Sequence, residues 1–169
     1  MTVVPSDEGD AARAGPPPER LRFLAETVRA ESVLLRATDG RLFAEPMTPE
    51  RAASLRTDDL LAERVDAFVA RFGRLQDTLA DKLLPALLDW RAEAMGTAID
   101  NLARAERLGW ISALDDWLAV RRQRNKMIHE YVRDSAELAE ALCVAHDAVP
   151  MLGQAAQAMS ALVLGDSSA

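Results

Sequence analysis

Residues 61–84 read LAERVDAFVARFGRLQDTLADKLL, and this stretch decides the fold class. Its apolar side chains recur at steps of three and four residues, which is the period of an amphipathic α-helix. They are Leu61, Val65, Phe68, Val69, Phe72, Leu75, Leu79, Leu83 and Leu84. Asp58 or Asp59 offers an N-cap, and Pro85 predicts a kink before the pattern resumes to about Trp90. We therefore expect one long helix that buries one face.

Helical periodicity also covers most of the remaining chain. The segments that show it are 21–38, 49–55, 91–109, 113–132 and 135–162. The turn pair Asp39-Gly40 and the helix-ending Gly109 predict where two of these helices stop, and Pro150 predicts a kink or break in the last. No segment alternates like a strand and no internal repeat is present, so we expect an all-α fold.

Two helices place apolar residues on one expected face, and three show cap signals. In the first helix the face is Leu21, Leu24, Val28, Leu34 and Leu35, and in segment 91–109 it is Met95, Ile99, Leu102 and Leu108. The expected caps are Thr48 followed by Pro49, Ser112 with Asp115, and Asp134 with Glu137. These signals fix the expected order of the helices along the chain.

A chain of 169 residues is the size of one domain with a sizeable core. Residues 1–19, which contain the run Pro16, Pro17 and Pro18, are expected to form a flexible tail, because three successive prolines do not fit inside a helix. A single helical domain is expected over 20–162, and a short C-terminal tail over 163–169.

The charge of the chain restricts the partners that we expect. The net charge is −7 and the pI is about 4.9, which argues against nucleic-acid binding through the global field, so any such contact must be local. Cys143 is the only cysteine, which excludes an intramolecular disulfide and a zinc site of several thiolates and suits a reducing cytosol. With no expected leader or membrane span, we predict a cytoplasmic location and no membrane partner.

Polar residues crowd into residues 121–131, RRQRNKMIHEY. On an ideal helix phased on Leu114, the side chains of Trp117, Leu118, Ile128 and Val132 form an apolar stripe. Arg121 and Asn125 fall near its centre, His129 falls on one shoulder, and Arg124 and Tyr131 fall on the other. Burying Arg and Asn in a sealed core would cost several kcal/mol unless each is paired. We therefore expect the stripe to open into a cleft or a subunit interface.

These residue types together suit one chemistry. His129 can give and take protons near neutral pH, Arg124 can hold a phosphate, and Asn125 can orient either group. Arg121, Arg122 and Lys126 add a local positive patch. With no metal-ligand cluster nearby in the sequence, this set suits metal-independent RNA cleavage through attack by the ribose 2′-OH. The alternative is that Arg121, Arg122 and Arg124 pair with carboxylates of neighbouring helices and His129 is an ordinary interior histidine.

The spacing of Arg124, four residues, His129, one residue and Tyr131 resembles the signature of HEPN-domain ribonuclease toxins of the HepT type. The resemblance extends through RFGRLQDTLADKLLPALL (71–88) and ERLGWISALDDWLAVRRQRN (106–125), and covers roughly residues 60–135. It implies an up-and-down helical bundle that forms a homodimer, with the motif helices of the two subunits facing each other. Arg124 and His129 would be the catalytic residues, supported by Asn125.

The resemblance also implies a partner. In HepT-type toxins the motif tyrosine, here Tyr131, accepts AMP that a minimal nucleotidyltransferase antitoxin transfers from ATP. The chain would then be the toxin of a type VII-like toxin–antitoxin pair and would need no metal or cofactor of its own. His146 and Cys143 match no functional position, and we expect both to be ordinary helix residues. Two other functions stay open: a non-catalytic substrate-binding subunit of a nucleotidyltransferase, and a plain interaction module.

Overall fold

The computed structural model describes residues 15–130 and 133–165, and every regular element in those residues is helical. This confirms the all-α class. The helices are α1 (Glu19–Leu42), α2 (Pro49–Ala53), α3 (Asp59–Asp77), α4 (Leu84–Trp90), α5 (Ala98–Arg107), α6 (Leu114–Glu130) and α7 (Ser135–Leu164). A short 3₁₀ turn, η1 (Ser54–Arg56), follows α2, and a π-helical turn, η2 (Thr78–Leu83), joins α3 to α4.

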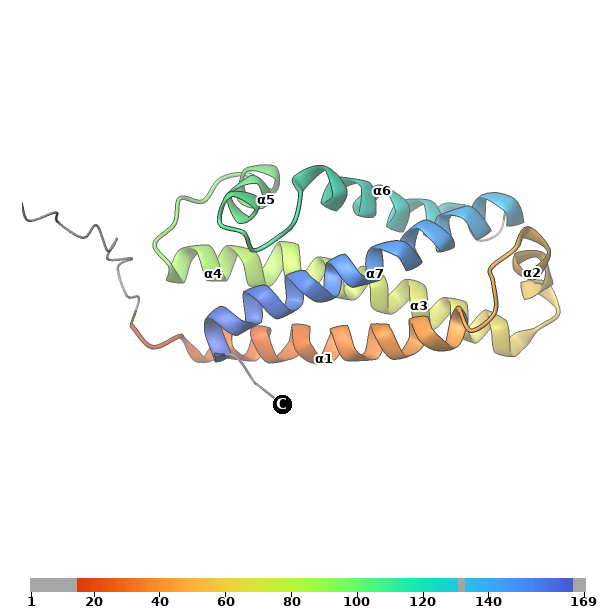
Figure 1. Cartoon of the computed structure of the whole chain (residues 1–169), viewed down its shortest axis with the longest axis horizontal. Coiled ribbons are helices and arrows are strands. Elements are labelled where there is room, and N and C mark those ends of the chain that lie inside the picture. The colour runs from red at the N-terminus through yellow and green to blue at the C-terminus, as the bar shows by residue number, and fades with distance from the viewer. Residues whose placement is uncertain (1–14, 131–132, 166–169) are drawn as a thin grey trace, which may run out of the picture.

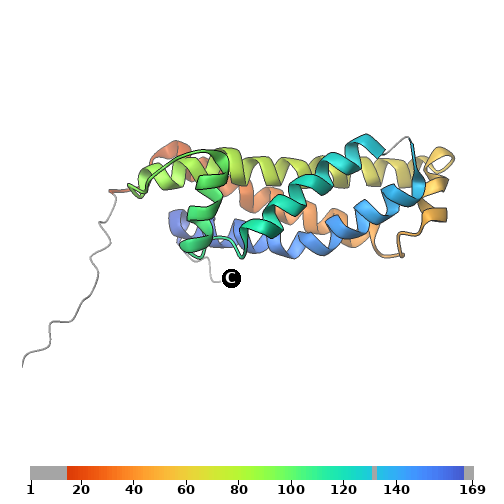
Figure 2. The same ribbon diagram turned by 90° about the horizontal axis from the view of Figure 1, so that it is seen from above.

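The long helices run along the longest axis of the molecule (Figure 1). The chain reverses direction between α1 and α3, between α4 and α6, and between α6 and α7, so successive long helices are antiparallel (Figure 1). Helix α1 packs against both α7 and α3, and α6 packs against α7 and α3. Helix α5 lies crosswise at the end of the bundle where α4 is located, as the view in Figure 2 shows. No helix in residues 15–130 and 133–165 is long and apolar enough to cross a membrane.

The core is formed mainly by the inner faces of α1, α3, α4 and α7, and the buried residues of α5 and α6 also belong to it. Phe68 and Phe72 of α3 are fully buried, with ring centroids 5.8 Å apart, and Phe43 after α1 meets Phe68 edge-on at 5.6 Å. The fully enclosed leucines of α3, η2 and α4 are Leu75, Leu79, Leu83, Leu84, Leu87 and Leu88. The apolar period of residues 61–84 therefore predicts this buried face correctly, although Val69 is only partly buried.

The first helix is longer than predicted. Asp39 and Gly40 lie inside α1, which ends at Leu42, so the predicted stop at this pair is wrong. A glycine close to a helix end is tolerated at a cost of about 1 kcal/mol. Leu34, expected on the inner face, is 47% exposed, whereas its neighbour Leu35 is buried.

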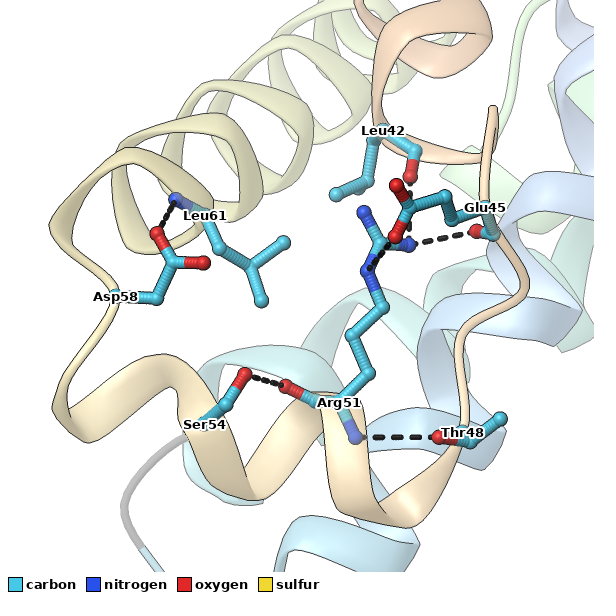
Figure 3. A network of polar contacts seen from close by, with 7 residues as sticks. All are labelled: Leu42, Glu45, Thr48, Arg51, Ser54, Asp58 and Leu61. Atoms are coloured by element: carbon cyan, nitrogen blue, oxygen red, sulfur yellow. Dashed lines mark hydrogen bonds and ion pairs between the residues drawn. The ribbon is translucent and has the colours of Figure 1, made fainter.

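Arg51 of α2 closes the end of α1. Its guanidinium Nη1 donates hydrogen bonds to the carbonyl oxygens of Leu42 at 2.8 Å and Glu45 at 2.6 Å (Figure 3). The last carbonyls of a helix have no intrahelical donor, so this arginine supplies one. Its carboxylate neighbour Glu45 is 4.0 Å from Nε and has a largely exposed side chain. Arg51 thus fixes the connection between α1 and α2.

The irregularity predicted at Pro85 lies one turn earlier. Residues 78–83 form the π-helical turn, and Pro85 stands in the first turn of α4. A proline ring normally clashes with the carbonyl four residues before it. The wider π turn places Pro85 at the start of the next helix, where a missing N–H costs little. Pro150, by contrast, lies inside α7, and the helix continues through it to Leu164, so the predicted break does not occur.

Three of the predicted caps are present. The side chains of Thr48, Asp58 and Asp134 accept hydrogen bonds from the first turns of α2, α3 and α7. Ser112 does not begin the motif helix, which starts at Leu114; the Leu114 amide donates instead to Glu106 Oε1 at 3.3 Å.

Segment 91–109 is less helical than predicted, because α5 covers only Ala98–Arg107. Thr97 and Asp100 form a reciprocal capping box at its start that the sequence analysis did not identify. Of the four apolar residues expected on one buried face, only Leu102 is buried; Met95 and Ile99 are more than half exposed, and Leu108 is 37% exposed.

Candidate functional site

Helix α6 carries the polar motif, and its buried face differs from the predicted one. Trp117, Val120 and Met127 are buried, whereas Asn125 is exposed and Arg121 is half-buried. The buried face is therefore turned by about one residue, roughly 100° on an ideal helix, from the one expected. The wheel was phased on Leu114, which is only partly buried, as is Leu118; Trp117, also predicted on the stripe, is buried. The prediction that Arg121 and Asn125 occupy the packing stripe is wrong.

Arg124 is the motif residue that points at a neighbouring helix. Its Nη1 donates a hydrogen bond to Asp77 Oδ1 of α3 at 2.7 Å, and 28% of its side chain is exposed. The contact depends on Gly73, one turn earlier in α3. A Cβ built on Gly73 would lie 2.9 Å from Arg124 Nε, closer than real Cβ atoms come to other heavy atoms. Arg124 can therefore lie across α3 because residue 73 has no side chain.

Arg121 makes a second ion pair to the same side of the bundle. Its Nη2 lies 3.7 Å from Asp81 Oδ2 in the π turn, and both side chains are more than 40% exposed. An ion pair as exposed to water as this one contributes little to stability. The two pairs correspond to the alternative in which the arginines bind carboxylates of neighbouring helices. Arg122 and Lys126 are exposed on other sides of α6.

A groove of about 350 Å³ lies beside the Arg124–Asp77 pair, between α3, η2 and α6. Its lining includes the cationic side chains of Arg74, Lys82 and Arg124 and one carboxylate, that of Asp77. Three positive groups against one negative group make this a locally positive concavity on an acidic chain. Such a groove favours an anionic ligand that can lie between the cationic side chains, such as a phosphate of a nucleic-acid backbone.

Sequence reasoning did not identify Arg74, Lys82, Asp77 or Gly73 as neighbours of the motif. Gly73 carried a usable signal, because a lone glycine inside a strong helical pattern usually has a packing reason. The π turn that carries Lys82 is also of a kind often found at functional sites. The π turn is a feature of the structure and could not be read from the sequence, and Gly73 alone does not indicate that Arg124 is its neighbour.

Two predicted site residues cannot be placed. Tyr131 lies outside the described residues. The backbone of His129 belongs to α6, but its side chain lies outside what the structure describes. Arg124 and Asn125 are therefore the catalytic candidates whose side chains are described, and they lie on different sides of the helix, one in the groove and one in solvent.

Buried polar groups also occur on the two helices that form the groove. Gln76 of α3 is 2% exposed and Trp117 of α6 is 1% exposed. Neither the Gln76 amide nor Trp117 Nε1 has a hydrogen-bond partner within residues 15–130 and 133–165. In the same ranges, no three His, Cys, Asp or Glu side chains gather closely enough to hold a metal ion.

Comparisons with protein-family models, curated proteins and solved structures find no match for this chain.

Proposed function

We propose that the chain is the toxin of a type VII-like toxin–antitoxin pair and acts as a metal-independent endoribonuclease. The observation that carries the proposal is the positive groove at Arg124, where Arg74 and Lys82 join the motif arginine on an otherwise acidic protein. The resemblance of residues 124–131 to the HepT signature supplies the class of reaction. An RNA phosphate in this groove would meet a preorganised arginine instead of a freely rotating one.

The mechanism follows from the chemistry of the motif residues. His129 takes the proton of the ribose 2′-OH, and the 2′-oxygen then attacks the adjacent phosphorus. Arg124 stabilises the negative charge that develops on the phosphorane, and Asn125 orients one of the reacting groups. The bond from phosphorus to the 5′-oxygen breaks, and the leaving oxygen takes a proton from the protonated His129 or from water, so the products end in a 2′,3′-cyclic phosphate and a 5′-hydroxyl.

The proposal includes a HEPN-like dimer and a way to switch it off. A second subunit that docks on the motif helix would bring the exposed Asn125 of one subunit close to the groove of the other. A minimal nucleotidyltransferase would transfer AMP from ATP to Tyr131, four residues beyond Met127, the last buried residue described in α6. The added negative charge and bulk would repel the RNA backbone from the groove.

Cleavage of RNA by purified variants tests the catalytic assignment. Arg124→Ala and His129→Ala are each expected to lower the cleavage rate at least a hundredfold, a typical loss for a group that acts in the transition state. Arg107→Ala is the matched control, because Arg107 is an exposed arginine at the end of α5, away from the groove. Full cleavage by both motif variants would contradict the proposal.

A second experiment tests the switch. Mass spectrometry of the chain produced together with a nucleotidyltransferase encoded by the adjacent gene should find AMP on Tyr131, and Tyr131→Phe should stay unmodified and active. An adduct on another residue would remove this part of the proposal and leave the ribonuclease assignment standing.

The Arg124–Asp77 ion pair favours a second candidate, a non-catalytic helical subunit of a nucleotidyltransferase or a plain interaction module. In that case Arg124 helps to hold α6 against α3, and the groove has no catalytic role. Purified wild-type protein would then cleave no RNA at any concentration, and Arg124→Ala would lower the free energy of unfolding or weaken association without removing an activity.

A further inference from the structure

A second groove, of about 1010 Å³, runs along the seam between α1 and α7. It is lined by residues of these two helices and by none of α6, so it is separate from the groove at Arg124. Its volume is at the upper end of the range of small-molecule sites. The seam is open here because the facing positions are small: Ser32 on α1 faces Gly153 on α7.

One end of this groove contains an oriented histidine. His146 Nδ1 lies 2.6 Å from Asp39 Oδ1, and the imidazole stacks on Phe43 with ring centroids 4.1 Å apart and planes 15° from parallel. A carboxylate against Nδ1 selects the tautomer with the proton on that nitrogen. Nε2 is then the ring nitrogen without a proton, so it can accept a hydrogen bond from another partner. From its sequence context we expect an ordinary helix residue at position 146, whereas in the structure the imidazole contacts Asp39 on one side and Phe43 on another.

Positive charge lies next to this histidine. Arg36 precedes Asp39 by one helical turn, lines the groove, is exposed, and has no ion-pair partner in the part of the chain that the structure describes. Arg29, two turns earlier on the same face of α1, donates to Ser160 Oγ at 2.8 Å and is the second arginine of a lining that also contains the carboxylates of Asp39 and Asp147. The Asp39 carboxylate is engaged by His146, so Arg36 is left to meet an anion from outside.

The rest of the lining offers neutral or acidic hydrogen-bonding groups. The Ser32 hydroxyl belongs to a residue only 6% exposed and has no hydrogen-bond partner among the described residues. Pro150 has no N–H, so the carbonyl of His146 lacks its usual partner four residues on. Gln154 and Asp147 add an amide and a carboxylate. These groups match hydroxyls, which donate and accept.

The groove lacks a surface on which a large aromatic ligand could stack. Among the described residues that line the groove, His146 has the only aromatic ring, and one face of that ring lies against Phe43. The floor consists of small or aliphatic residues such as Val149, Pro150 and Ala156. An anionic head with a compact body rich in hydroxyls therefore fits this lining better than a heteroaromatic ring does.

We propose that the α1–α7 groove binds a sugar phosphate, with the phosphate on Arg36 and the sugar hydroxyls on His146 Nε2, Ser32 and Gln154. This site is separate from the proposed ribonuclease site. Helices α1 and α7 do not carry the motif, and the two grooves have no lining residue in common. Binding at this seam would tie together the two longest helices of the protein.

Calorimetric titration of the full-length chain tests the site. The probes are ribose 5-phosphate, glucose 6-phosphate and glycerol 3-phosphate, compared with inorganic phosphate and with ribose. We expect at least one sugar phosphate to bind more tightly than inorganic phosphate and ribose. Arg36→Gln and His146→Gln should each raise its Kd about tenfold, the effect of losing one hydrogen bond to the ligand. Arg22→Gln, an exposed arginine of α1 that does not line the groove, should leave Kd unchanged.

A steric pair of variants gives an independent readout. Gly153→Ala should bind as the wild type does, because its Cβ meets only Ser32 Oγ, at an ordinary 3.6 Å. Gly153→Leu fills the groove without changing a charge and should abolish binding, with folding checked by circular dichroism. The proposal is overturned if no sugar phosphate binds at millimolar concentration, if inorganic phosphate binds as tightly, or if Arg36→Gln has no effect. RNA cleavage by Arg36→Gln should be normal, which separates this outcome from a failure of the proposed function.

Discussion

Arg124 shows how strongly one side chain depends on the residue that it crosses. It passes over Gly73 to reach Asp77, and both partners of this ion pair are about a third exposed. Solvent reduces the energy of such a pair to at most about 1 kcal/mol. Its value therefore lies in the orientation of the guanidinium and much less in stability.

Gly73→Ala should uncouple this pair. The new Cβ would lie 2.9 Å from Arg124 Nε, so the guanidinium must move away from Asp77. A double-mutant cycle with Arg124→Ala and Asp77→Ala should give a coupling energy of about 0.5–1 kcal/mol in the wild type and close to zero in the Gly73→Ala background. Equal coupling in both backgrounds would show that the side chain has another route past residue 73.

Cys143 should react slowly with alkylating agents. Burial, and to a lesser extent the charge of Asp147, raise the pKa of its thiol above the ordinary 9.0, so the thiolate is scarce near neutral pH. The rate of modification by iodoacetamide should still be rising at pH 9, and at a fixed lower pH the chain unfolded in urea should react faster. A rate that levels off below pH 9 would contradict the raised pKa.

The sequence predicted some single residues of the site and missed others for a physical reason. It singled out Arg124 by its spacing to His129, and the structure places that arginine in a positive groove. The sequence could not reveal Asp77 or Lys82 as neighbours of Arg124, because that prediction needs to know how α3 and α6 are rotated relative to each other. The roles of His129 and Tyr131 stay predictions.

At the scale of elements, glycines at two helix positions have opposite roles. Gly73 makes room for Arg124, whereas a Cβ on Gly153 of α7 would make only ordinary contact. Helix propensity favours alanine over glycine by about 1 kcal/mol in a helix interior.

Gly153→Ala should therefore raise the free energy of unfolding by roughly 0.5–1 kcal/mol, measured by urea denaturation. Gly73→Ala is the matched comparison: it gains the same propensity but displaces an arginine, so its net effect should be smaller or reversed. Equal stabilisation by both variants would mean that the close approach at Gly73 costs nothing.

Helix starts were predicted better than helix ends and helix faces. Thr48, Asp58 and Asp134 cap as expected, because a cap depends on residues within one turn. The end of α1 depends instead on Arg51, nine residues beyond Leu42. The face of α6 was misjudged by about one residue because its apolar residues are few, and those that are buried were not the ones used to set the phase.

At the scale of the whole molecule, composition and periodicity were sufficient for an all-α fold. The order of the long helices was also predicted, since each one shows a helical period or a cap signal in its own sequence. The proposed dimer stays a prediction, and the polar motif that suggested an interface is partly satisfied by ion pairs to Asp77 of α3 and Asp81 of η2.

Arg51 holds one end of the bundle together, and its loss should be felt globally. Arg51→Met removes the donor to two carbonyls while keeping most of the side-chain volume, and should lower the free energy of unfolding by on the order of 2 kcal/mol in urea denaturation. Glu45→Gln is the control; it touches only the long 4.0 Å contact of an 81% exposed carboxylate, so it should change stability by less than about 0.5 kcal/mol. A large effect of Glu45→Gln would show that Arg51 stabilises the fold through the Glu45 carboxylate and not through the two carbonyl oxygens.

The π turn at residues 78–83 also determines which insertions and deletions the chain can accept. Such a turn holds one residue more than an α-helical turn, so the helix after it is rotated by roughly 100° from the phase it would otherwise have. Leu84, Leu87 and Leu88 of α4 are buried in that rotated phase. Deleting a single residue between 78 and 83 would convert the π turn into an α-helical turn and leave these three leucines facing the core. Inserting one residue would instead rotate them by roughly 100° away from it. The chain should therefore tolerate the loss of one residue in this turn better than the gain of one.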